Sequence, residues 1–287
     1  MKQYLKNYSN YLYFILCLGI IFAVNGKLIS RFTIMYTIAF LAAIGFVLYK
    51  AKSDKYPIRF ILEGALALLL GGFVGSHFLC VYILQEHHGF QTFFSFSGKS
   101  AIGGILGAIG WGLLYSRVKM GMSWREIMQG SDYAAMAYLL GGIFVKIGCF
   151  FSGCCFGMPC SPGWGVVFPP HSKPGMLFPN ISLIPTQLYA SLMYLIMFIF
   201  LLWLARRKPY HGYLTIWFYV LVAIHRLVDD SFRYFPPQEI FGTLAGMRMT
   251  LYQWIAIGLL AIAAIMFRLG KLYNQRLGCQ CKEEMVL

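Results

Sequence analysis

The chain has 287 residues, of which 59% are hydrophobic and only 12% are charged, and its formal net charge is +14. A soluble domain carries about 25% charged residues, so this composition excludes an ordinary soluble protein. The positive charge does not indicate nucleic-acid binding, because the basic residues concentrate in short loops between apolar runs, as they do in membrane proteins. The composition therefore predicts an integral membrane protein.

The apolar runs predict where the chain crosses the membrane. Five runs of 17 or more residues lack Asp, Glu, Lys and Arg: 8–26, 32–49, 64–85, 100–116 and 249–267. Three further candidates begin near Tyr133, Ile181 and Gly212. About 20 apolar residues cross a bilayer as a helix. We therefore expect an all-α, polytopic fold with a seven-span core and an extra N-terminal span.

The distribution of Lys and Arg predicts the orientation in the membrane. The basic loops, which are expected in the cytoplasm together with the C-terminal tail, are 50–59, 117–131 and 205–211. The loops expected outside are 86–99, 152–180 and 234–247. The first run lacks a small-x-small cleavage site, which favours an uncleaved anchor. We divide the chain into an anchor or extra span (1–30), a membrane domain (31–268) and a cytoplasmic tail (269–287).

Two of the predicted spans are interrupted by cations at a similar depth. Thirteen uncharged residues separate Asp132 from Lys146, and thirteen separate His211 from the pair His225-Arg226. At 1.5 Å per residue, both cations lie roughly 20 Å above the inner boundary of a core about 30 Å thick. Ionisable groups are costly inside a membrane and indicate a functional site. We expect a cationic pocket that opens to the outer leaflet.

The end of the second of these spans adds a triplet of charges. Arg226, Asp230 and Arg233 follow i,i+4 and i,i+3 spacings, which place them on one helix face. Arginine binds phosphate in a bidentate manner and lysine contributes a point charge. The pattern predicts a pocket for a phospholipid headgroup. The alternative is a set of structural ion pairs, or arginines that reach from a helix end to the headgroups.

The segment "KIGCFFSGCC" (146–155) contains three cysteines, and Cys160 follows it. Structural zinc sites favour closely spaced pairs of cysteines with a second pair at a distance, and no His, Asp or Glu accompanies these thiols, so we predict no metal here. A disulfide on the oxidising side, apolar packing of free thiols, and a nucleophilic Cys149 or Cys154 beside Lys146 stay open. The tail pair Cys279-x-Cys281 is a weak signal for a metal or for acylation.

The glycines of this region predict a close approach of the backbone to a ligand. Gly148 and Gly153 lie within the cysteine segment, and Gly103 and Gly104 begin another span. Glycine permits tight turns and close packing in membranes. We therefore place these four glycines at the edge of the expected pocket.

Five segments, in order, resemble the prolipoprotein diacylglyceryl transferase family. They are "RFTIMYTIAF", "SAIGGILG", "KIGCFFSGCCFG" followed by "WGVVFP", "IPTQLYASL" and "HRLVDDSFR", and the resemblance covers residues 31–267. It implies a multi-pass enzyme of the bacterial cytoplasmic (inner) membrane without a cofactor. The implied reaction transfers diacylglyceryl from phosphatidylglycerol to the lipobox cysteine of exported prolipoproteins.

The chain departs from the family pattern at several polar positions. Phe32 stands for a tyrosine, Ile102 and Ile184 for two histidines, Ala190 for a glutamate, and Lys146 for an arginine. Cys149 and Cys154 take the places of an asparagine and a glutamate. The glycines, Gln187, Tyr189, Arg226, Asp230 (for a glutamate) and Arg233 match the pattern.

The resemblance and the charge pattern together assign roles to individual residues. We expect Arg226 and Lys146 to stabilise the departing phosphate and Asp230 to orient Arg226. The remaining residues expected to contact substrate are Arg233, Gln187, Tyr189, Gly103, Gly104, Gly148, Gly153, Cys149 and Cys154. The general base stays open between a lysine and the histidines His77 and His225. The alternatives are a related transferase with another acceptor or a thiol mechanism, and a non-catalytic homologue that binds lipid or protein.

Overall fold

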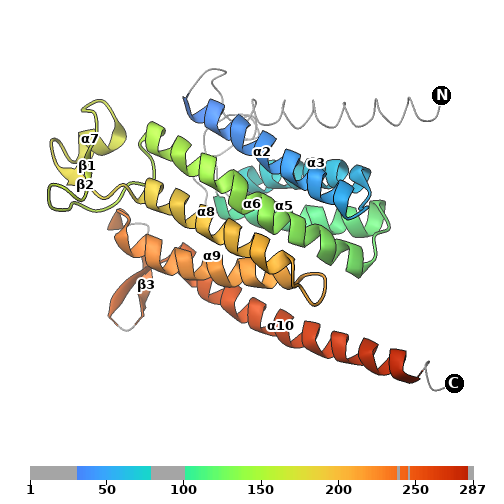
Figure 1. The fold of residues 1–287 in the computed structure, drawn as a ribbon. Coiled ribbons are helices and arrows are strands. Elements are labelled where there is room, and N and C mark those ends of the chain that lie inside the picture. Colours follow the sequence, from blue (N-terminus) through green and yellow to red (C-terminus); the bar gives the residue numbers. More distant parts are fainter. Residues whose placement is uncertain (1–30, 79–100, 238–239, 245, 284–287) are drawn as a thin grey trace, which may run out of the picture. The chain divides into compact units, whose positions relative to one another are not determined.

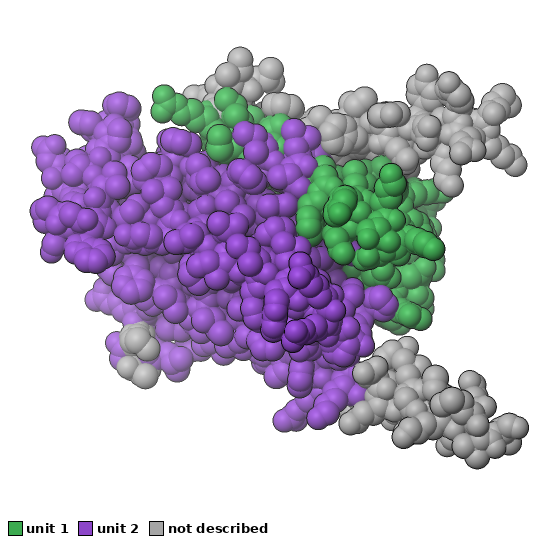
Figure 2. Space-filling view, viewed as in Figure 1, with its two compact units in different colours: residues 1–37, 44–130 green, residues 38–43, 131–287 purple. Residues whose placement is uncertain are grey.

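The computed structural model describes residues 31–78, 101–237, 240–244 and 246–283 (Figure 1). The predicted N-terminal span at 8–26 lies outside the described residues. The chain forms two compact units, drawn in different colours in Figure 2. Unit 1 comprises residues 1–37 and 44–130, and unit 2 comprises residues 38–43 and 131–287. Helices α2 and α6 contribute residues to both units.

Among the described residues, five helices are long and apolar enough to cross a membrane. They are α2 (Arg31–Ser53), α3 (Ile58–Phe78), α6 (Trp124–Ser152), α8 (Thr186–Ala205) and α10 (Leu251–Glu283). Helix α9 (Tyr213–Phe232) is also 20 residues long but carries several charges near its end. The structure thus confirms a largely helical, polytopic protein. The count of seven spans stays a prediction.

Glycines bring two helices of unit 1 into close contact. Helix α3 packs along α5 (Ala101–Leu114), which continues as a single π-helical turn, η2 (Tyr115–Lys119). A Cβ at Gly75 would lie 2.7 Å from the Cα of Gly107, and a Cβ at Gly72 would lie 3.4 Å from the carbonyl oxygen of Gly104. Such distances are possible only between small residues, which allow membrane helices to approach closely.

Helix α9 is anchored in unit 2 at its first turn. It contacts both α8 and α10. The buried carboxylate of Asp132, on α6, accepts hydrogen bonds from the backbone N–H groups of Gly212 and Thr215, both at 3.0 Å. The first N–H groups of a helix have no partner within the helix, so Asp132 caps α9 from a neighbouring helix. Lys208 Nζ lies 3.5 Å from the same carboxylate.

Two short antiparallel ribbons modify the all-α expectation. Strand β1 (Val166–Val167) pairs with β2 (Ser182–Leu183), and β3 (Ile240–Leu244) pairs with β4 (Met247–Thr250). Figure 1 shows both at one end of unit 2, where α6 and α9 finish and α8 and α10 begin. Ribbons as short as these leave no long apolar run in the sequence, which is why composition did not predict them.

The first ribbon belongs to a small folded segment between α6 and α8. The segment also contains the short helix α7 (Lys173–Leu177). Its core consists of Phe156, Phe168 and Leu183, and the ring of Phe156 stacks on that of Tyr234 at 5.6 Å between centroids. The loop predicted at 152–180 is therefore an ordered cap on this end of unit 2. At the other end of the chain, α10 continues past residue 268 to Glu283, so most of the predicted tail is helical.

Candidate functional site: a buried cationic cluster in unit 2

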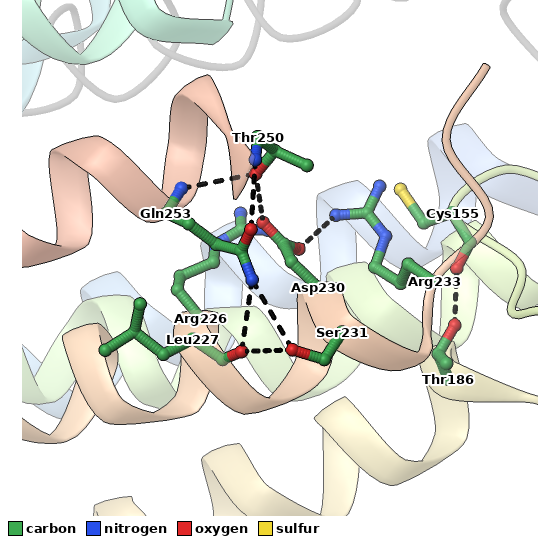
Figure 3. A network of polar contacts seen from close by, with 9 residues as sticks. All are labelled: Cys155, Thr186, Arg226, Leu227, Asp230, Ser231, Arg233, Thr250 and Gln253. Carbon is green, nitrogen blue, oxygen red and sulfur yellow. Dashed lines mark hydrogen bonds and ion pairs between the residues drawn. The ribbon is translucent and has the colours of Figure 1, made fainter. Parts of the chain in front are cut away.

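The carboxylate of Asp230 lies between two guanidinium groups (Figure 3). Its Oδ1 accepts from Arg226 Nη1 at 3.3 Å and from Arg233 Nη1 at 2.9 Å, and the Asp230 side chain is fully buried. The sequence spacing predicted this contact, but the geometry differs in one respect. Helix α9 ends at Phe232, and Arg233 has an extended backbone. Its side chain reaches back to Asp230 from beyond the helix.

A second helix fixes the other carboxylate oxygen of Asp230. Oδ2 accepts from Thr250 Oγ1 at 3.4 Å. Thr250 and Gln253 form a capping box at the start of α10, since Thr250 N donates to Gln253 Oε1 at 2.9 Å and Gln253 N donates to Thr250 Oγ1 at 3.2 Å. Gln253 Nε2 also donates to Leu227 O at 3.3 Å. This pair was not predicted, although the spacing Thr-x-x-Gln before an apolar run was a usable signal.

Lys146 enters the same region from α6. It is 7% exposed, and its Nζ lies 5.9 Å from the ring centroid of Tyr194 on α8. The Tyr194 ring packs over Gly142 of α6, where no side chain larger than hydrogen would fit. Within the described part of the chain, Lys146 makes no ion pair with a carboxylate. Its charge is therefore available to an anionic ligand.

Two further ionisable groups of α9 line this region. His225 is buried with its ring 5.1 Å from that of Tyr194, and Asp229 is 7% exposed. His225 Nε2 and Asp229 Oδ2 are buried and have no hydrogen-bond partner among the described residues. Asp229 interacts electrostatically with Lys146 and Arg233. Asp229 was not among the predicted site residues, although its place beside Asp230 in a membrane helix was a usable signal.

The cysteine segment folds into a tight turn because α6 ends in a Schellman motif. Gly153 has φ 69°, Gly153 N donates to Phe150 O at 3.2 Å, and Cys154 N donates to Cys149 O at 3.1 Å. Cys155 also has a positive φ, 57°. These two left-handed residues return the chain over the end of α6, so that Cys154 and Cys155 face Cys149. Gly153 is thus required for the turn, and Gly148 is buried within α6.

Two buried residues at the start of α8 hold this turn in place. Thr186 Oγ1 donates to Cys155 O at 2.7 Å, and Gln187 Nε2 donates to Cys154 O at 2.7 Å. Gln187 is 0% exposed, and its Oε1 is buried without a partner among the described residues. Tyr189 is 48% exposed, with its hydroxyl 3.4 Å from Trp164 O. The expected contacts of Gln187 and Tyr189 with a lipid headgroup stay predictions.

The three thiols of the turn form a cluster. The sulfur atoms of Cys149, Cys154 and Cys155 all lie within 4.8 Å of one another, and none is in a disulfide. Hydrogen bonds from Cys149 and Cys154, together with the nearby charges of Arg233 and Lys146, lower the pKa of Cys155. Figure 3 shows the sulfur of Cys155 beside the guanidinium of Arg233. Cys149 and Cys154 were predicted site residues and Cys155 was not, because nothing in the sequence fixes the turn that brings it in.

The remaining predicted positions lie in unit 1, elsewhere in unit 2 or outside the described residues. Gly103 and Gly104 lie on α5 in unit 1, where they pack on α3, and their contact with substrate stays a prediction. In unit 2, Gly153 forms the turn at the end of α6, and Gly148 is buried within that helix. The side chains of His77 and Ile102 lie outside the described residues. Ala190 is fully buried on α8, so no polar group stands at that position.

The helices are apolar, and at one end of unit 2 they bring together three cations and two aspartates, with Lys146 buried and both arginines partly buried. These features define a polytopic membrane protein with a cationic cluster. Comparison with known proteins gives the family. The family model for prolipoprotein diacylglyceryl transferase matches residues 19–269. The chain belongs to the prolipoprotein diacylglyceryl transferase family.

Curated relatives are similar over most of the chain but at low identity. The phosphatidylglycerol–prolipoprotein diacylglyceryl transferase of Clostridium tetani is 23% identical over 259 residues, covering 89% of this chain and 99% of the relative. The proteins of the same description from Fusobacterium nucleatum and Verminephrobacter eiseniae are 28% and 29% identical over 215 and 218 residues. These matches cover 61% and 74% of this chain, and 72% of each relative.

Proposed function

We propose that this protein is a phospholipid-using transferase that moves diacylglyceryl from phosphatidylglycerol to the lipobox cysteine of prolipoproteins. Family membership supports this reaction class, with phosphatidylglycerol as donor and a prolipoprotein as acceptor, in the bacterial inner membrane. The observation that carries the proposal is the pair of guanidinium groups held by one buried carboxylate, Asp230. The charge of Lys146 acts on the neighbouring His225 together with both arginines.

The charge balance of the cluster favours an anionic ligand. Lys146, Arg226 and Arg233 supply three positive charges, while Asp229 and Asp230 supply two negative charges, which leaves an excess of one positive charge. A phosphodiester headgroup carries one negative charge and would neutralise this excess. Bidentate guanidinium contacts with phosphate are strong and directional. A neutral ligand would leave the excess charge buried, which is costly in a membrane.

The same geometry suits the departure of a phosphate. In the proposed reaction the acceptor sulfur forms a bond to the glyceryl carbon, and the bond from that carbon to the phosphate oxygen breaks. The electron pair leaves with glycerol phosphate, and the proton of the acceptor thiol passes to solvent, directly or through a base. Arg226 and Lys146 stabilise the negative charge that develops on the leaving phosphate, because preorganised cations in a dry site act most strongly there. Asp230 holds Arg226 in position for this task.

One observation favours a second candidate function. Phe32, Ile184 and Ala190 stand at positions where the family has polar residues, and Ala190 is fully buried. A homologue that binds a phospholipid without transferring its glyceryl group would keep the cations and could lose these polar groups. Separate measurements of phospholipid binding and of diacylglyceryl transfer therefore distinguish the two functions.

The test uses the purified full-length protein in vesicles that contain phosphatidylglycerol, with a lipobox peptide as acceptor. Mass spectrometry is expected to show a diacylglyceryl group on the peptide cysteine and an equal amount of released glycerol phosphate. Arg226→Ala is expected to lower the rate about 10²-fold to 10³-fold, as loss of an oxyanion-stabilising group does elsewhere, while Arg206→Ala, an exposed arginine at the end of α8, leaves it unchanged.

Each result that contradicts the proposed transfer reaction leads to a different conclusion. Lipid bound in an Arg226-dependent manner, with no consumption of lipid and no change of the peptide, would indicate the non-catalytic homologue. Consumption of phosphatidylglycerol with an unmodified peptide would indicate a transferase with another acceptor. Full activity of Arg226→Ala would remove the phosphate role from this cluster.

A further inference from the structure

The thiol cluster of Cys149, Cys154 and Cys155 combines three features of a metal site. Three soft ligand atoms converge within 4.8 Å, their loop is held rigid by side chains outside the set, and a polar group without a partner lies beside them. The sequence predicted no metal, because it does not show two spaced pairs of ligands. The fold instead brings together three ligands, Cys149 near the end of α6 and Cys154 and Cys155 in the turn that follows this helix.

The spacing of the sulfurs is close to what a zinc ion requires. Three sulfurs about 2.3 Å from a shared tetrahedral zinc ion lie about 3.8 Å apart. The observed limit of 4.8 Å requires each pair of sulfurs to approach by no more than about 1 Å to reach this spacing. Cys149 is buried, and the other two cysteines are partly exposed, which leaves a side through which an ion can enter.

The surroundings of the thiols resemble the supporting layer of a metal centre. The main chain is fixed at Cys154 by Gln187 and at Cys155 by Thr186, both of them buried side chains. Ser152 Oγ lies 3.3 Å from Cys154 Sγ and can donate to it. Hydrogen bonds of this kind orient ligands and tune a bound metal.

The charges of the side chains around the thiol cluster are compatible with a bound zinc ion. Three thiolates and one divalent cation carry one net negative charge, which the excess positive charge of the cluster that includes Arg233 and Lys146 would balance while no phosphate is bound. Carboxylate-preferring ions such as Mg²⁺ and Ca²⁺ do not suit an all-sulfur set, whereas Zn²⁺ does.

We propose that Cys149, Cys154 and Cys155 form a three-thiolate site for Zn²⁺, and that its fourth position takes the thiol of the acceptor cysteine. Zinc sites with three protein ligands keep one position for water or substrate. The catalytic part of this proposal rests on the proposed transfer reaction. It adds a candidate to the choice of base that the reaction leaves open, because Ile102 and Ile184 stand where the family has histidines, and a zinc ion would ionise the acceptor thiol without either of them.

The chemistry of the step is balanced without an oxidant or reductant. With zinc bound, the acceptor thiol would replace a water in the fourth position as its thiolate, because a thiol that coordinates zinc is deprotonated. The displaced water and the proton would pass to solvent. The bound sulfur forms the bond to the glyceryl carbon. The carbon–oxygen bond to phosphate breaks, and glycerol phosphate leaves with the electron pair.

The first test measures metal directly and needs no activity. The protein is purified in detergent with a phosphine reductant and without chelator, in a Cys279→Ala/Cys281→Ala background that removes the tail thiols. We expect about one zinc ion per chain, as for a closed structural or catalytic site, and a thiolate-to-metal charge-transfer band when Co²⁺ replaces it. Cys149→Ala/Cys154→Ala/Cys155→Ala is expected to lose both signals.

Matched controls separate loss of the site from loss of the fold. Cys160→Ala removes a thiol whose sulfur lies 4.0 Å from Ser182 Oγ and outside the cluster, and it is expected to keep the metal. Cys154→Ser alters one ligand with little change in size, and it is expected to weaken zinc retention about tenfold or more, as loss of supporting interactions does in other zinc sites. Size-exclusion profiles show which variants fold.

The second test relates the metal to transfer. Arg226→Ala is expected to retain zinc while losing transfer, whereas metal-depleted protein is expected to lose transfer and regain it with Zn²⁺. Zinc bound by a protein that catalyses no transfer would refute the proposed function and leave the metal site standing. Absence of zinc and of the cobalt band from the folded protein, retention of both by the triple variant, or full transfer by the metal-free protein would overturn the inference.

Discussion

Asp230 Oδ1 accepts hydrogen bonds from Arg226 at 3.3 Å and from Arg233 at 2.9 Å, so one buried carboxylate oxygen holds two guanidinium groups. Arg226 lies within α9 and Arg233 lies beyond its end. Their side chains meet because both donate to the same oxygen atom of Asp230. The carboxylate lowers the cost of keeping two cations in an apolar bundle, and it fixes the direction in which each presents its remaining N–H groups.

Asp230→Asn is therefore expected to lower transfer about tenfold or more, because the two arginines would repel each other and lose their common acceptor. Asp230→Glu, which has the residue type expected from the family pattern, is expected to restore most of the activity. The measurement is the initial rate of peptide modification at several lipid fractions. Equal rates for the Asn and Glu variants would show that Asp230 does not position Arg226.

Lys146 offers a second test of the cationic cluster. Lys146→Met removes the charge and keeps a long apolar side chain beside Tyr194, and it is expected to weaken dependence on phosphatidylglycerol and to lower transfer about tenfold to a hundredfold. Lys146→Arg is expected to be largely active. The matched control is Lys173→Met, an exposed lysine at the start of α7. A Lys146→Met variant as active as the control would show that the charge is not used.

Gly157→Ala tests the packing of the cap against the end of α9. A Cβ at this position would lie 2.6 Å from Ile184 O and 2.7 Å from Ile184 Cβ, and Gly157 forms a bridge with Arg233. Overpacking of this kind costs about 1–3 kcal/mol, so the thermal unfolding temperature in detergent is expected to fall. Gly258→Ala, on α10 with nothing within 4 Å of the added Cβ, is expected to leave stability unchanged or slightly higher.

Asp132→Ala tests how α9 is positioned. It removes the acceptor of three hydrogen bonds, from Gly212 N, Thr215 N and Thr215 Oγ1. Loss of a helix cap costs about 0.5–2 kcal/mol, and a lower unfolding temperature is expected. Asp54→Ala removes a partly exposed pair with Lys50 and is expected to have little effect, because such pairs contribute about 0–1 kcal/mol. Equal shifts for the two variants would rule out a capping role for Asp132.

The sequence by itself determined the class of protein and part of the site. Uncharged runs of 17 or more residues permit few structures other than membrane helices, because an unpaired backbone is too costly in lipid. The spacing of Arg226, Asp230 and Arg233 likewise predicted their ion pairs, because residues three and four apart meet on a helix. Both are local properties, and local periodicity is what a sequence displays directly.

Only the tertiary structure decided how distant segments meet. Lys146, Tyr194 and His225 lie on three different helices, and no spacing in the sequence relates them. The two small ribbons were missed for a similar reason, since their pairing depends on contacts between loops. The thiol cluster depends on left-handed backbone at Gly153 and Cys155 and on side chains from α8 that hold the turn. The sequence shows three cysteines, and the fold brings their sulfur atoms together.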